Sequence, residues 1–554
     1  MSEPAGRVQP AKLGRASALL ASGTVVSRVL GFVKVAILAA AIGQVGSSSA
    51  DAFAIANQLP NNIYALVAGG VLSAVLVPQI VKASRGVDGG SRYINKIVTL
   101  GVVIFAAVTV IATLLAPVLV DLYSQSSSGG SGFTPQAFAL ATAFAYLCLP
   151  QIFFYALYSL LSEVLNARNV FGPFTWAPVV NNIVAIVGLV VFMSLFGTAQ
   201  QNADVDVWTG DGIVLLAGTF TFGVAAQAII LFVFWRRAGL RYRPDFRWRG
   251  VGLSATGKAA GWLFGMILVT QLAGIVQSRV ASIASGDAAS VFTLQNSWLI
   301  FMLPHSVVAV SIATAYFTRM SEHATRGDLA AVRSDLSGSL RGIGLLIVFS
   351  AVALAVVAYP FARFFETEYS KVLAMGNVIL AFVPGLILFS ALFLVQRVFY
   401  ALGDMRTPFI LQCVQSAVFV AGALACTQLA DEWIAVGIAL VTTVAGGTQA
   451  LLAMIVVRAR LGGSGGGLVV KRYLQYLGLS LVSGAVGLVV LWLLGGFSEW
   501  GFAQSGKAQA ILAIAITGTV MAACYFGLLA LVRNPELASV AKPLASKFGR
   551  RGME

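Results

Sequence analysis

Stretches of about twenty or more mostly apolar residues recur along the whole chain, separated by short polar connections. A helix needs about 20 mostly apolar residues to cross the hydrocarbon core of a bilayer. Fourteen stretches meet this requirement, and they run approximately over 16–43, 52–81, 97–123, 135–162, 173–197, 212–235, 259–283, 288–318, 342–360, 372–400, 408–430, 433–457, 473–495 and 508–532. The pattern predicts an all-α polytopic membrane protein with fourteen transmembrane helices.

Composition excludes other classes of protein. Hydrophobic residues make up 58% of the chain and charged residues only 10%, whereas soluble domains carry about 25% charged residues. A soluble enzyme is therefore not expected, and neither is a disordered chain, because disordered chains are polar and rich in charge. The sequence contains no Walker-type phosphate loop, so ATP hydrolysis within this chain is not expected either.

Metal or cofactor chemistry is not indicated. The sequence has only two histidines, His305 and His323, and it has no cluster rich in His and Glu. The four cysteines lie inside apolar stretches without paired or metal-like spacing, and they are Cys148, Cys413, Cys426 and Cys524. We expect them to be small buried hydrophobic side chains, and we expect no metal and no cofactor.

The distribution of Lys and Arg predicts the orientation, because cytoplasmic segments of membrane proteins carry an excess of both. With the N-terminus inside, the predicted cytoplasmic segments hold 29 of the 36 basic residues. The richest is the connection between spans six and seven, with Arg236, Arg237, Arg241, Arg243, Arg247, Arg249 and Lys258. Both termini are thus predicted to be cytoplasmic. The net charge of +15 then mainly reflects the basic residues of the predicted cytoplasmic segments. Nucleic-acid binding is therefore not expected.

An internal repeat is indicated by two pairs of similar segments. Residues 59–66 of the second span resemble residues 303–310 of the eighth, and residues 164–167 of the fourth resemble 398–401 of the tenth. Six spans separate the members of each pair, so the copies would have the same orientation. The alternative is chance similarity between short segments. Two parallel bundles are typical of a transporter that rocks about a central cavity.

The predicted organisation follows from the spans and the repeat. It comprises a cytoplasmic N-terminal tail (1–15), a six-helix bundle (16–240), a second six-helix bundle (241–460), a linker with two further helices (461–532) and a cytoplasmic C-terminal tail (533–554). The two bundles are expected to be pseudo-symmetric, and the last two helices are an addition to them.

Ionisable side chains inside a span are costly and usually face a bundle interior or water. The first span carries Arg28 and Lys34, whose directions around a helix differ by about 120°. Both could border one broad cavity. Since nearly all of the intramembrane charge is positive, we expect a cationic cavity for an anionic substrate such as a phosphate or pyrophosphate head group.

For other ionisable residues in or near the spans, a structural role is the alternative to a functional one. Asp51 opens the second span and Arg279 lies in the seventh. His305 either lines the cavity or is a packed neutral imidazole. Glu163 and Arg397 lie near the ends of the fourth and tenth spans, where snorkelling or pairing between bundles is the alternative to a functional role.

At these residues the chain resembles the MurJ (MviN) family, lipid II flippases of the multidrug/oligosaccharidyl-lipid/polysaccharide exporter superfamily. The segment Ser27–Lys34 resembles the first-helix signature of the family, and Asp51–Phe53 with Leu59–Asn61 resembles its second helix. Two later regions also match, namely Leu165 to Arg168 with Pro178 and Asn181–Asn182, and Arg397 to Asp404 with Thr407–Pro408. These matches span both predicted bundles, and fourteen helices is the family's count.

The resemblance implies a bacterial plasma-membrane protein of cell-wall biogenesis. It would move undecaprenyl-pyrophosphate-linked disaccharide pentapeptide, which is lipid II, from the inner to the outer leaflet. The family's cavity holds the head group on cationic residues, and a groove near helices 13 and 14 is thought to take the lipid tail. We expect a monomer in the bilayer, with cell-wall synthesis proteins as candidate partners.

The candidate site residues combine those that the resemblance implies, among which Ser27 and Arg28 match the family directly, with the intramembrane residues described above. The substrate cavity would include Ser27, Arg28, Lys34, Asp51, Asn61, Tyr64, Arg279 and His305. The motif residues with structural roles would be Pro60, Asn166, Pro178, Arg397, Asp404 and Pro408.

The chain departs from the family at several of these positions. Lys34 stands where an arginine is frequent, Val35 where many members have aspartate, and Tyr64 where some carry a cavity arginine. Many relatives have an arginine in the eighth helix, but no Lys or Arg occurs here between Arg279 and Arg319. Arg279 is a candidate to compensate for that loss.

Some relatives bind sodium through acidic residues on helices 7 and 11. Here no Asp or Glu occurs over 246–286 or over 405–430, so sodium coupling through that site is not expected. Coupling to the membrane potential or to another ion stays open, because moving a charge across the membrane is worth about 2.3 kcal/mol per 100 mV.

The reduced cavity charge keeps two alternatives open beside lipid II transport. One is a flippase for another lipid-linked glycan or a teichoic-acid precursor. The other is a paralogue that does not transport and instead acts as a scaffold for cell-wall synthesis.

Overall fold

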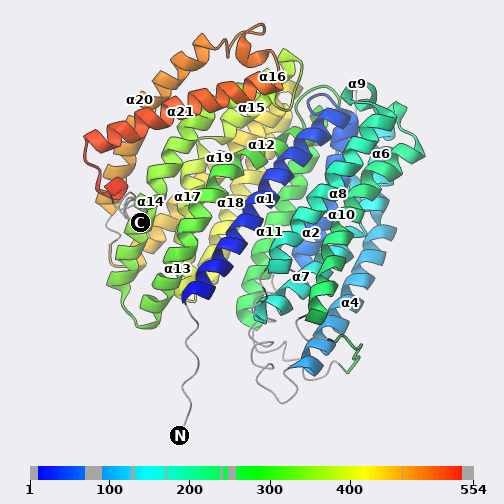
Figure 1. Ribbon diagram of the computed structural model, residues 1–554, viewed down its shortest axis with the longest axis horizontal. Coiled ribbons are helices and arrows are strands. Elements are labelled where there is room, and N and C mark those ends of the chain that lie inside the picture. Colours follow the sequence, from blue (N-terminus) through cyan, green and yellow to red (C-terminus); the bar gives the residue numbers. More distant parts are fainter. Residues whose placement is uncertain are drawn as a thin grey trace, which may run out of the picture. The chain divides into compact units, whose positions relative to one another are not determined.

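The structure is a computed structural model that describes residues 10–68, 90–126, 132–168, 170, 172–237, 241–247, 257–463 and 466–538. Within these ranges every regular element is a helix, as the apolar pattern predicts (Figure 1). The contacts divide the chain into two compact units. Unit 1 consists of Met1–Gly43 and Ser47–Ser282, and unit 2 consists of Gln44–Gly46 and Ile283–Glu554.

Unit 1 is built around long helices that pack through small residues. Its helices are α1 (Pro10–Ile42), α2 (Ser48–Ala68), α4 (Ser91–Leu114), α5 (Ala116–Tyr123), α6 (Pro135–Cys148), α7 (Gln151–Ala167), α8 (Gly172–Phe196), α9 (Ala199–Asn202), α10 (Gly210–Arg237) and α11 (Gly257–Ala281). Helix α8 packs against both α1 and α10. A β-carbon on Gly188 of α8 would lie 1.9 Å from a side-chain carbon of Thr219 on α10. Close backbone approach at small residues is a common way to pack helices in lipid.

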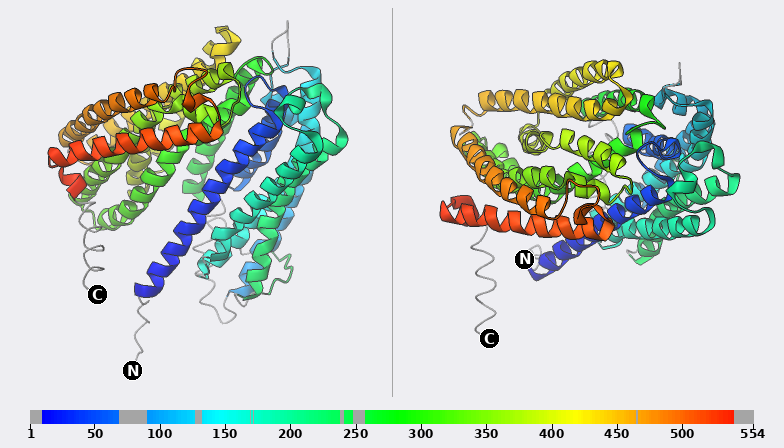
Figure 2. Two further views of the ribbon diagram at one scale, coloured as in Figure 1. Left: turned by 45° about the horizontal axis from the view of Figure 1, so that its top comes forward. Right: turned by 90° about the horizontal axis from the view of Figure 1, so that it is seen from above.

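Unit 2 contains the second half of the chain. Its helices are α12 (Val291–Pro304), α13 (Val310–Thr325), α14 (Leu329–Val356), α15 (Ala358–Arg363), α16 (Tyr369–Phe382), α17 (Gly385–Ala401), α18 (Arg406–Ala425), α19 (Asp431–Arg460), α20 (Gly466–Leu493) and α21 (Lys507–Leu531), with a π-helical turn, His305–Ala309, between α12 and α13. The hairpin of α20 and α21 (orange and red in Figure 2) packs through α20 onto α14. Tyr476 and Tyr525 are fully buried in this packing.

Twelve helices in the described part of the chain are long and apolar enough to span a membrane, or thirteen if the bent pair α16 and α17 is one span. They coincide with thirteen of the fourteen predicted spans. The remaining predicted span, 52–81, is helical over Ser48–Ala68, and its second part lies outside the described residues. The polytopic all-helical architecture is thus confirmed, and the count of fourteen stays a prediction.

Several predicted spans are broken, and the breaks recur in the same order in both units. In unit 1, α4 is followed by short α5, and α6 is separated from α7 at Leu149–Pro150. In unit 2, α14 is followed by short α15, and α16 is separated from α17 at Val383–Pro384, with a 40° bend. A proline lacks the backbone donor that a continuous helix needs. The matching order supports the predicted internal repeat.

The unit boundary differs from the predicted boundary near residue 240. Helix α11 groups with unit 1, because it packs against α2 and α5. Its polar side chains explain this grouping. Gln271 Nε2 donates to the carbonyl of Asn62 at 2.8 Å, and Gln58 Nε2 donates to the Ser278 hydroxyl at 2.9 Å. Counting spans cannot reveal such contacts.

Asp404 connects α17 to α18 and α19, in the region where the sequence marks a motif. One of its carboxylate oxygens accepts hydrogen bonds from the backbone N–H groups of Arg406 and Thr407, each at 3.0 Å. The other oxygen lies 2.5 Å from the guanidinium of Arg460 on α19. Burial alone would raise the pKa of Asp404, but the bonds from Thr407 and the charge of Arg460 hold it below its ordinary value.

We expect the Asp404→Ala substitution to lower the free energy of unfolding by about 1–2 kcal/mol, because α18 loses its N-terminal cap. Arg460→Gln should cost less, since it removes the ion pair and leaves the cap. Thermal unfolding of the purified full-length protein measures both. Equal losses in the two variants would contradict the assignment of the stabilisation to the cap.

Glu366 is a buried carboxyl of unit 2, located between α15 and α16. Its Oε1 accepts a hydrogen bond at 2.8 Å from the backbone N–H of Val45. Burial raises the pKa of Glu366 to about 7, against the opposing effects of the Val45 N–H and of the Lys371 and Lys507 charges. The folded protein therefore binds a proton in a pH range where an unfolded chain has released it.

The stability of the fold should fall as pH rises from about 5 to 8, because the ordinary pKa of Glu366 is 4.5 and its folded value is about 7. In Glu366→Gln this contribution is absent. The fall in Tm between pH 5 and pH 8 should therefore be about 1–2 °C smaller in the variant than in the wild type. Melting curves at pH 5 and pH 8 compare the two proteins. Identical pH dependence of Tm in both would argue against this role of Glu366.

Candidate functional site

The first-helix signature lies on α1 in unit 1, and an asparagine of α8 holds part of it in place. Asn182 Nδ2 donates to the carbonyl of Ser27 at 2.8 Å and to its hydroxyl at 3.3 Å. The Asn182 side chain also lies next to Gly31, one turn further along α1. Ser27 therefore has a helix-packing role, and the Asn181–Asn182 motif contributes to the α1–α8 contact.

Arg28 and Lys34 occupy different surroundings on α1. Arg28 is exposed, whereas Lys34 is half-buried. The Lys34 ammonium lies 5.4 Å from the ring centroid of Phe220 on α10, a position in which the ring face attracts a cation. This difference agrees with the angular separation expected from the helix. Arg28 is thus the more accessible of the two for an anionic ligand.

The predicted site residues of α2 are divided between its interior and its surface. Asp51 is fully buried in the first turn of the helix. Asn61 is exposed and Tyr64 is half-buried. The Tyr64 ring packs 6.0 Å from that of Tyr155 on α7, so only Asn61 and part of Tyr64 are accessible.

Arg279 of α11 forms hydrogen bonds at the C-terminal end of α5. Its Nη1 donates to the carbonyl of Asp121 at 2.8 Å, and its Nη2 donates to the side chain of Gln125 at 3.0 Å. A cation at the C-terminus of a helix offsets the partial negative charge of the last carbonyl groups. Arg279 therefore contributes to the attachment of α11, and these contacts do not support a compensating role in a substrate cavity.

His305 in unit 2 is packed rather than exposed to a cavity. It is buried in the π-helical turn, and its Nδ1 lies 3.0 Å from the hydroxyl of Ser390 on α17. The rings of Phe389 and Phe393 contact it edge-on, with centroids 4.7 Å and 5.2 Å away. Of the two readings of this histidine, the structure favours the packed imidazole.

Arg397 lies one turn beyond Phe393 on α17, within a group of aromatic rings. Its guanidinium carbon is 4.5 Å from the ring centroid of Phe393, 5.6 Å from Phe317 and 5.8 Å from Tyr400. These rings stabilise the cation and keep it half-buried. The sequence indicated a motif residue here, but the aromatic environment comes from two separate helices and was not predicted.

The other motif residues lie at helix ends or inside helices. Pro60 and Pro178 are within α2 and α8, Asn166 is exposed at the end of α7, and Pro408 is buried in the first turn of α18. These positions fit structural roles in shaping the helices.

An apolar groove lies in unit 2 beside α20, the thirteenth predicted span, and the sequence did not identify the residues that line it. One part, with a volume of about 300 Å³, is lined by residues of α14, α17, α19 and α20. A second part, of about 600 Å³, extends along α14, α17 and α20. Both parts share Ile387 and Leu477, and their linings are apolar, with Tyr473 as the one aromatic side chain among the described lining residues. We define these two parts together as the unit 2 groove.

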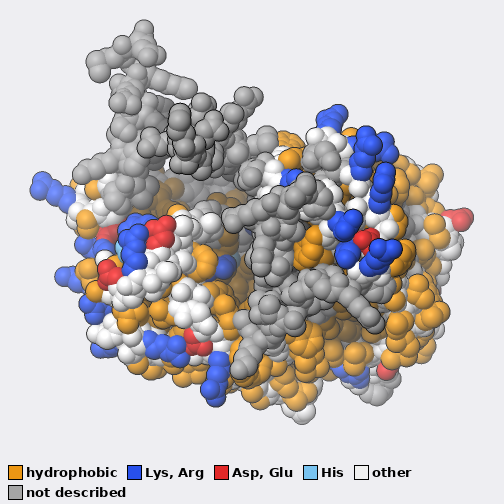
Figure 3. All heavy atoms as spheres, turned by 90° about the horizontal axis from the view of Figure 1, so that it is seen from below, with side chains coloured by type: hydrophobic (Ala, Val, Ile, Leu, Met, Phe, Trp, Pro, Cys, Tyr) orange, Lys and Arg blue, Asp and Glu red, His pale blue; other side chains and the backbone are white. Residues whose placement is uncertain are grey.

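The surface of the described residues combines apolar regions with clusters of basic side chains. Figure 3 shows one face on which Lys and Arg side chains gather beside extensive hydrophobic surface. In unit 1 the exposed basic residues near the end of α10 are Arg236, Arg237, Arg241, Arg243 and Arg247. The segment 241–247 is fixed on α4, where the Thr99 hydroxyl accepts from the Asp245 N–H at 3.0 Å.

Comparison with known proteins places these features in a family. A family model described as lipid II flippase MurJ matches residues 38–508. A probable lipid II flippase MurJ of Haemophilus influenzae is 26% identical over 407 residues, which cover 70% of this chain and 75% of the relative. Another, from Rhizobium meliloti, is 26% identical over 448 residues and covers 78% of each chain.

Solved structures share the fold. A lipid II flippase MurJ in an inward closed conformation aligns over 92% of this chain and 99% of its own, with a TM-score of 0.69 and 20% identity. An inward-facing multidrug resistance MATE family transporter of the MOP superfamily aligns over 79% and 94%, with a TM-score of 0.61 and 16% identity. Because the family model matches most of the sequence, this multi-pass membrane protein belongs to the lipid II flippase MurJ family.

Proposed function

We propose that this protein flips lipid II from the inner to the outer leaflet of the bacterial plasma membrane. The observation that carries the proposal is the family match over residues 38–508. The exposed Arg28 and the half-buried Lys34 on a membrane-spanning helix agree with it. A guanidinium binds phosphate oxygens with two parallel hydrogen bonds, while an ammonium acts as a point charge.

The unit 2 groove supports a place for the lipid tail. Its walls come from α14, α17, α19 and α20, and α20 corresponds to the thirteenth predicted span. An aliphatic wall holds a hydrocarbon chain through dispersion contacts, which are individually weak but numerous along a long chain. We infer that the polyprenyl chain of the substrate lies in this groove.

Transport would proceed by alternating access around a cationic cavity, with both termini in the cytoplasm and the protein acting as a monomer. Neither α11 nor α18 contains an Asp or Glu, so an acidic sodium site on these helices has no ligands. We propose that the membrane potential drives the cycle, since a charge crossing it gains about 2.3 kcal/mol per 100 mV.

Transport of another lipid-linked glycan is the second candidate. The observation that favours it is the engagement of Arg279 by Asp121 and Gln125. Since Arg279 is held there, it does not replace the eighth-helix arginine that many relatives carry. A cavity with less positive charge would fit a head group with fewer phosphates.

In cells depleted of this protein, outer-leaflet lipid II should fall, and the wild-type gene should restore it. The double variant Arg28→Ala, Lys34→Ala should restore it about tenfold less well or worse, because the head group loses its cations. A leaflet-specific assay of lipid II measures all three strains.

The matched control is Arg326→Ala, Arg458→Ala, which removes two exposed charges elsewhere and should restore transport fully. Unchanged outer-leaflet lipid II on depletion would count against the lipid II proposal. Full restoration by the Arg28 and Lys34 double variant would refute the cationic cavity while leaving transport itself intact.

The groove is tested by Leu477→Trp, because Leu477 lines both parts of it and a larger side chain narrows it. We expect purified protein to bind undecaprenyl phosphate about tenfold more weakly after this change, since part of the apolar contact is lost. Binding of a phosphate with a short prenyl chain should not change. An unaltered affinity for the long chain would exclude this groove as the tail site.

A further inference from the structure

The chain after α21 is folded into a defined turn. Helix α21 ends at Leu531, and Arg533 adopts a left-handed backbone conformation with φ of 48°. Asn534 then donates its backbone N–H to the carbonyl of Leu529 at 3.0 Å, while its side-chain oxygen accepts from the N–H of Leu537 at 3.0 Å. This second bond caps a new helical turn, which fixes the direction of Glu536.

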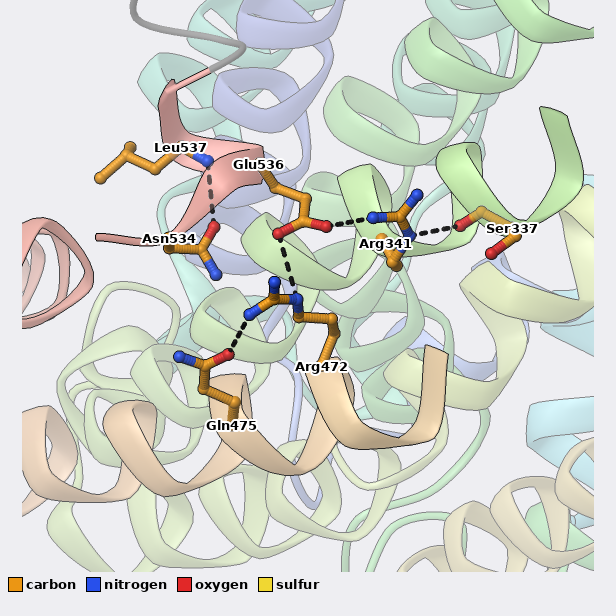
Figure 4. A network of polar contacts seen from close by, with 7 residues as sticks. All are labelled: Ser337, Arg341, Arg472, Gln475, Asn534, Glu536 and Leu537. Atoms are coloured by element: carbon orange, nitrogen blue, oxygen red, sulfur yellow. Dashed lines mark hydrogen bonds and ion pairs between the residues drawn. The ribbon is translucent and has the colours of Figure 1, made fainter. Parts of the chain in front are cut away.

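Glu536 lies between two arginines from different helices (Figure 4). One carboxylate oxygen is paired with the guanidinium of Arg341 on α14, and the other lies 3.4 Å from Nε of Arg472 on α20. The residue is only 9% exposed. A single carboxylate thus joins the ends of α14 and α20, and we call these three residues the Glu536 clamp.

Further hydrogen bonds fix the two arginines of the clamp. Arg341 Nε donates to the carbonyl of Ser337 at 3.2 Å, and Arg472 Nη1 donates to the side chain of Gln475 at 2.7 Å (Figure 4). Each guanidinium is therefore anchored to its own helix while it binds the shared carboxylate. Charge-assisted bonds of this kind are stronger and more specific in geometry than neutral ones.

The two helices joined by the clamp are also two walls of the unit 2 groove. The residues next to the arginines, Leu340 and Tyr473, line the groove, and the Tyr473 hydroxyl donates to the carbonyl of Leu340 at 3.0 Å. Tyr473 packs directly on Gly344, where a β-carbon would lie 2.6 Å from its ring. The spacing of α14 and α20 at the clamp therefore determines the position of groove-lining side chains.

Removing the carboxylate would leave two guanidinium groups facing each other. Like charges repel most strongly where water is scarce, and breaking one partner of a buried ion pair is more disruptive than replacing the whole pair. The ends of α14 and α20 would move apart, and Leu340 and Tyr473 would move with them. A wider groove makes fewer contacts with a chain inside it.

We propose that Glu536 is a positioning residue for the unit 2 groove, and that through Arg341 and Arg472 it sets the fit of a long polyprenyl chain. The inference rests on the proposed function, in which the groove holds the lipid tail. It assigns to the segment after α21 a part in selecting substrates by chain length.

The test compares the affinity of purified full-length protein for undecaprenyl phosphate and for farnesyl phosphate, which share a head group and differ in chain length. Glu536→Gln should weaken the binding of the long chain about tenfold and leave that of the short chain unchanged. Glu499→Gln is the matched control, because Glu499 is an exposed acid in the connection between α20 and α21. It should bind both ligands as the wild type does.

Glu536→Asp keeps the charge but shortens the side chain, so its loss of affinity for the long chain should be smaller than that of Glu536→Gln. This variant also provides the test if Glu536→Gln does not fold. Equal weakening of both ligands, or no change in either, would overturn the positioning role. If Leu477→Trp binds the long chain normally, the groove proposal fails first and the role of Glu536 fails with it. If Leu477→Trp loses long-chain binding and the Glu536 variants do not, only the clamp inference is wrong.

Discussion

A polar group inside the hydrocarbon core of a membrane has no water to bind, so it must find its partner within the protein. This constraint explains contacts that hydrophobic packing alone would not produce. In unit 1 the Asn182 side chain binds the backbone and hydroxyl of Ser27, and Arg279 binds the end of α5. Polar side chains thereby determine which helices pair, whereas apolar side chains have nearly the same environment against lipid as against another helix.

The same constraint explains how charge is distributed between structural and functional roles. Arg397 is surrounded by three aromatic rings, and Arg279 by a carbonyl and an amide oxygen. Both cations are satisfied by the protein itself. Arg28 is exposed, and an exposed guanidinium on a membrane-spanning helix keeps its capacity to bind phosphate. Accessibility, more than the presence of charge, therefore separates candidates for substrate binding from residues that hold the fold together.

Much of the fold could be predicted from the sequence, because the length and apolar character of each span depend on local composition. The division into units could not. Helix α11 joins unit 1 through Gln271, Ser278 and Arg279, whose partners are distant in sequence. The site was predictable only in part for the same reason. Helix periodicity predicted that Arg28 and Lys34 point in directions about 120° apart on α1, but the burial of Asp51 and the packing of His305 depend on neighbouring helices. The groove has no motif, since any aliphatic side chain can line it.

A lipid-linked glycan is an amphiphile, so its charged head group and its apolar tail suit different kinds of surface. Exposed positive charge is found on α1 of unit 1, and the aliphatic groove is found in unit 2. A ligand shifts a conformational equilibrium only by as much as its affinities for the two states differ. A substrate whose head group and tail both contribute to binding has two independent sources of that difference. A positioning residue at the groove, such as Glu536, could then influence transport without touching the head group, because it would alter one of these contributions alone.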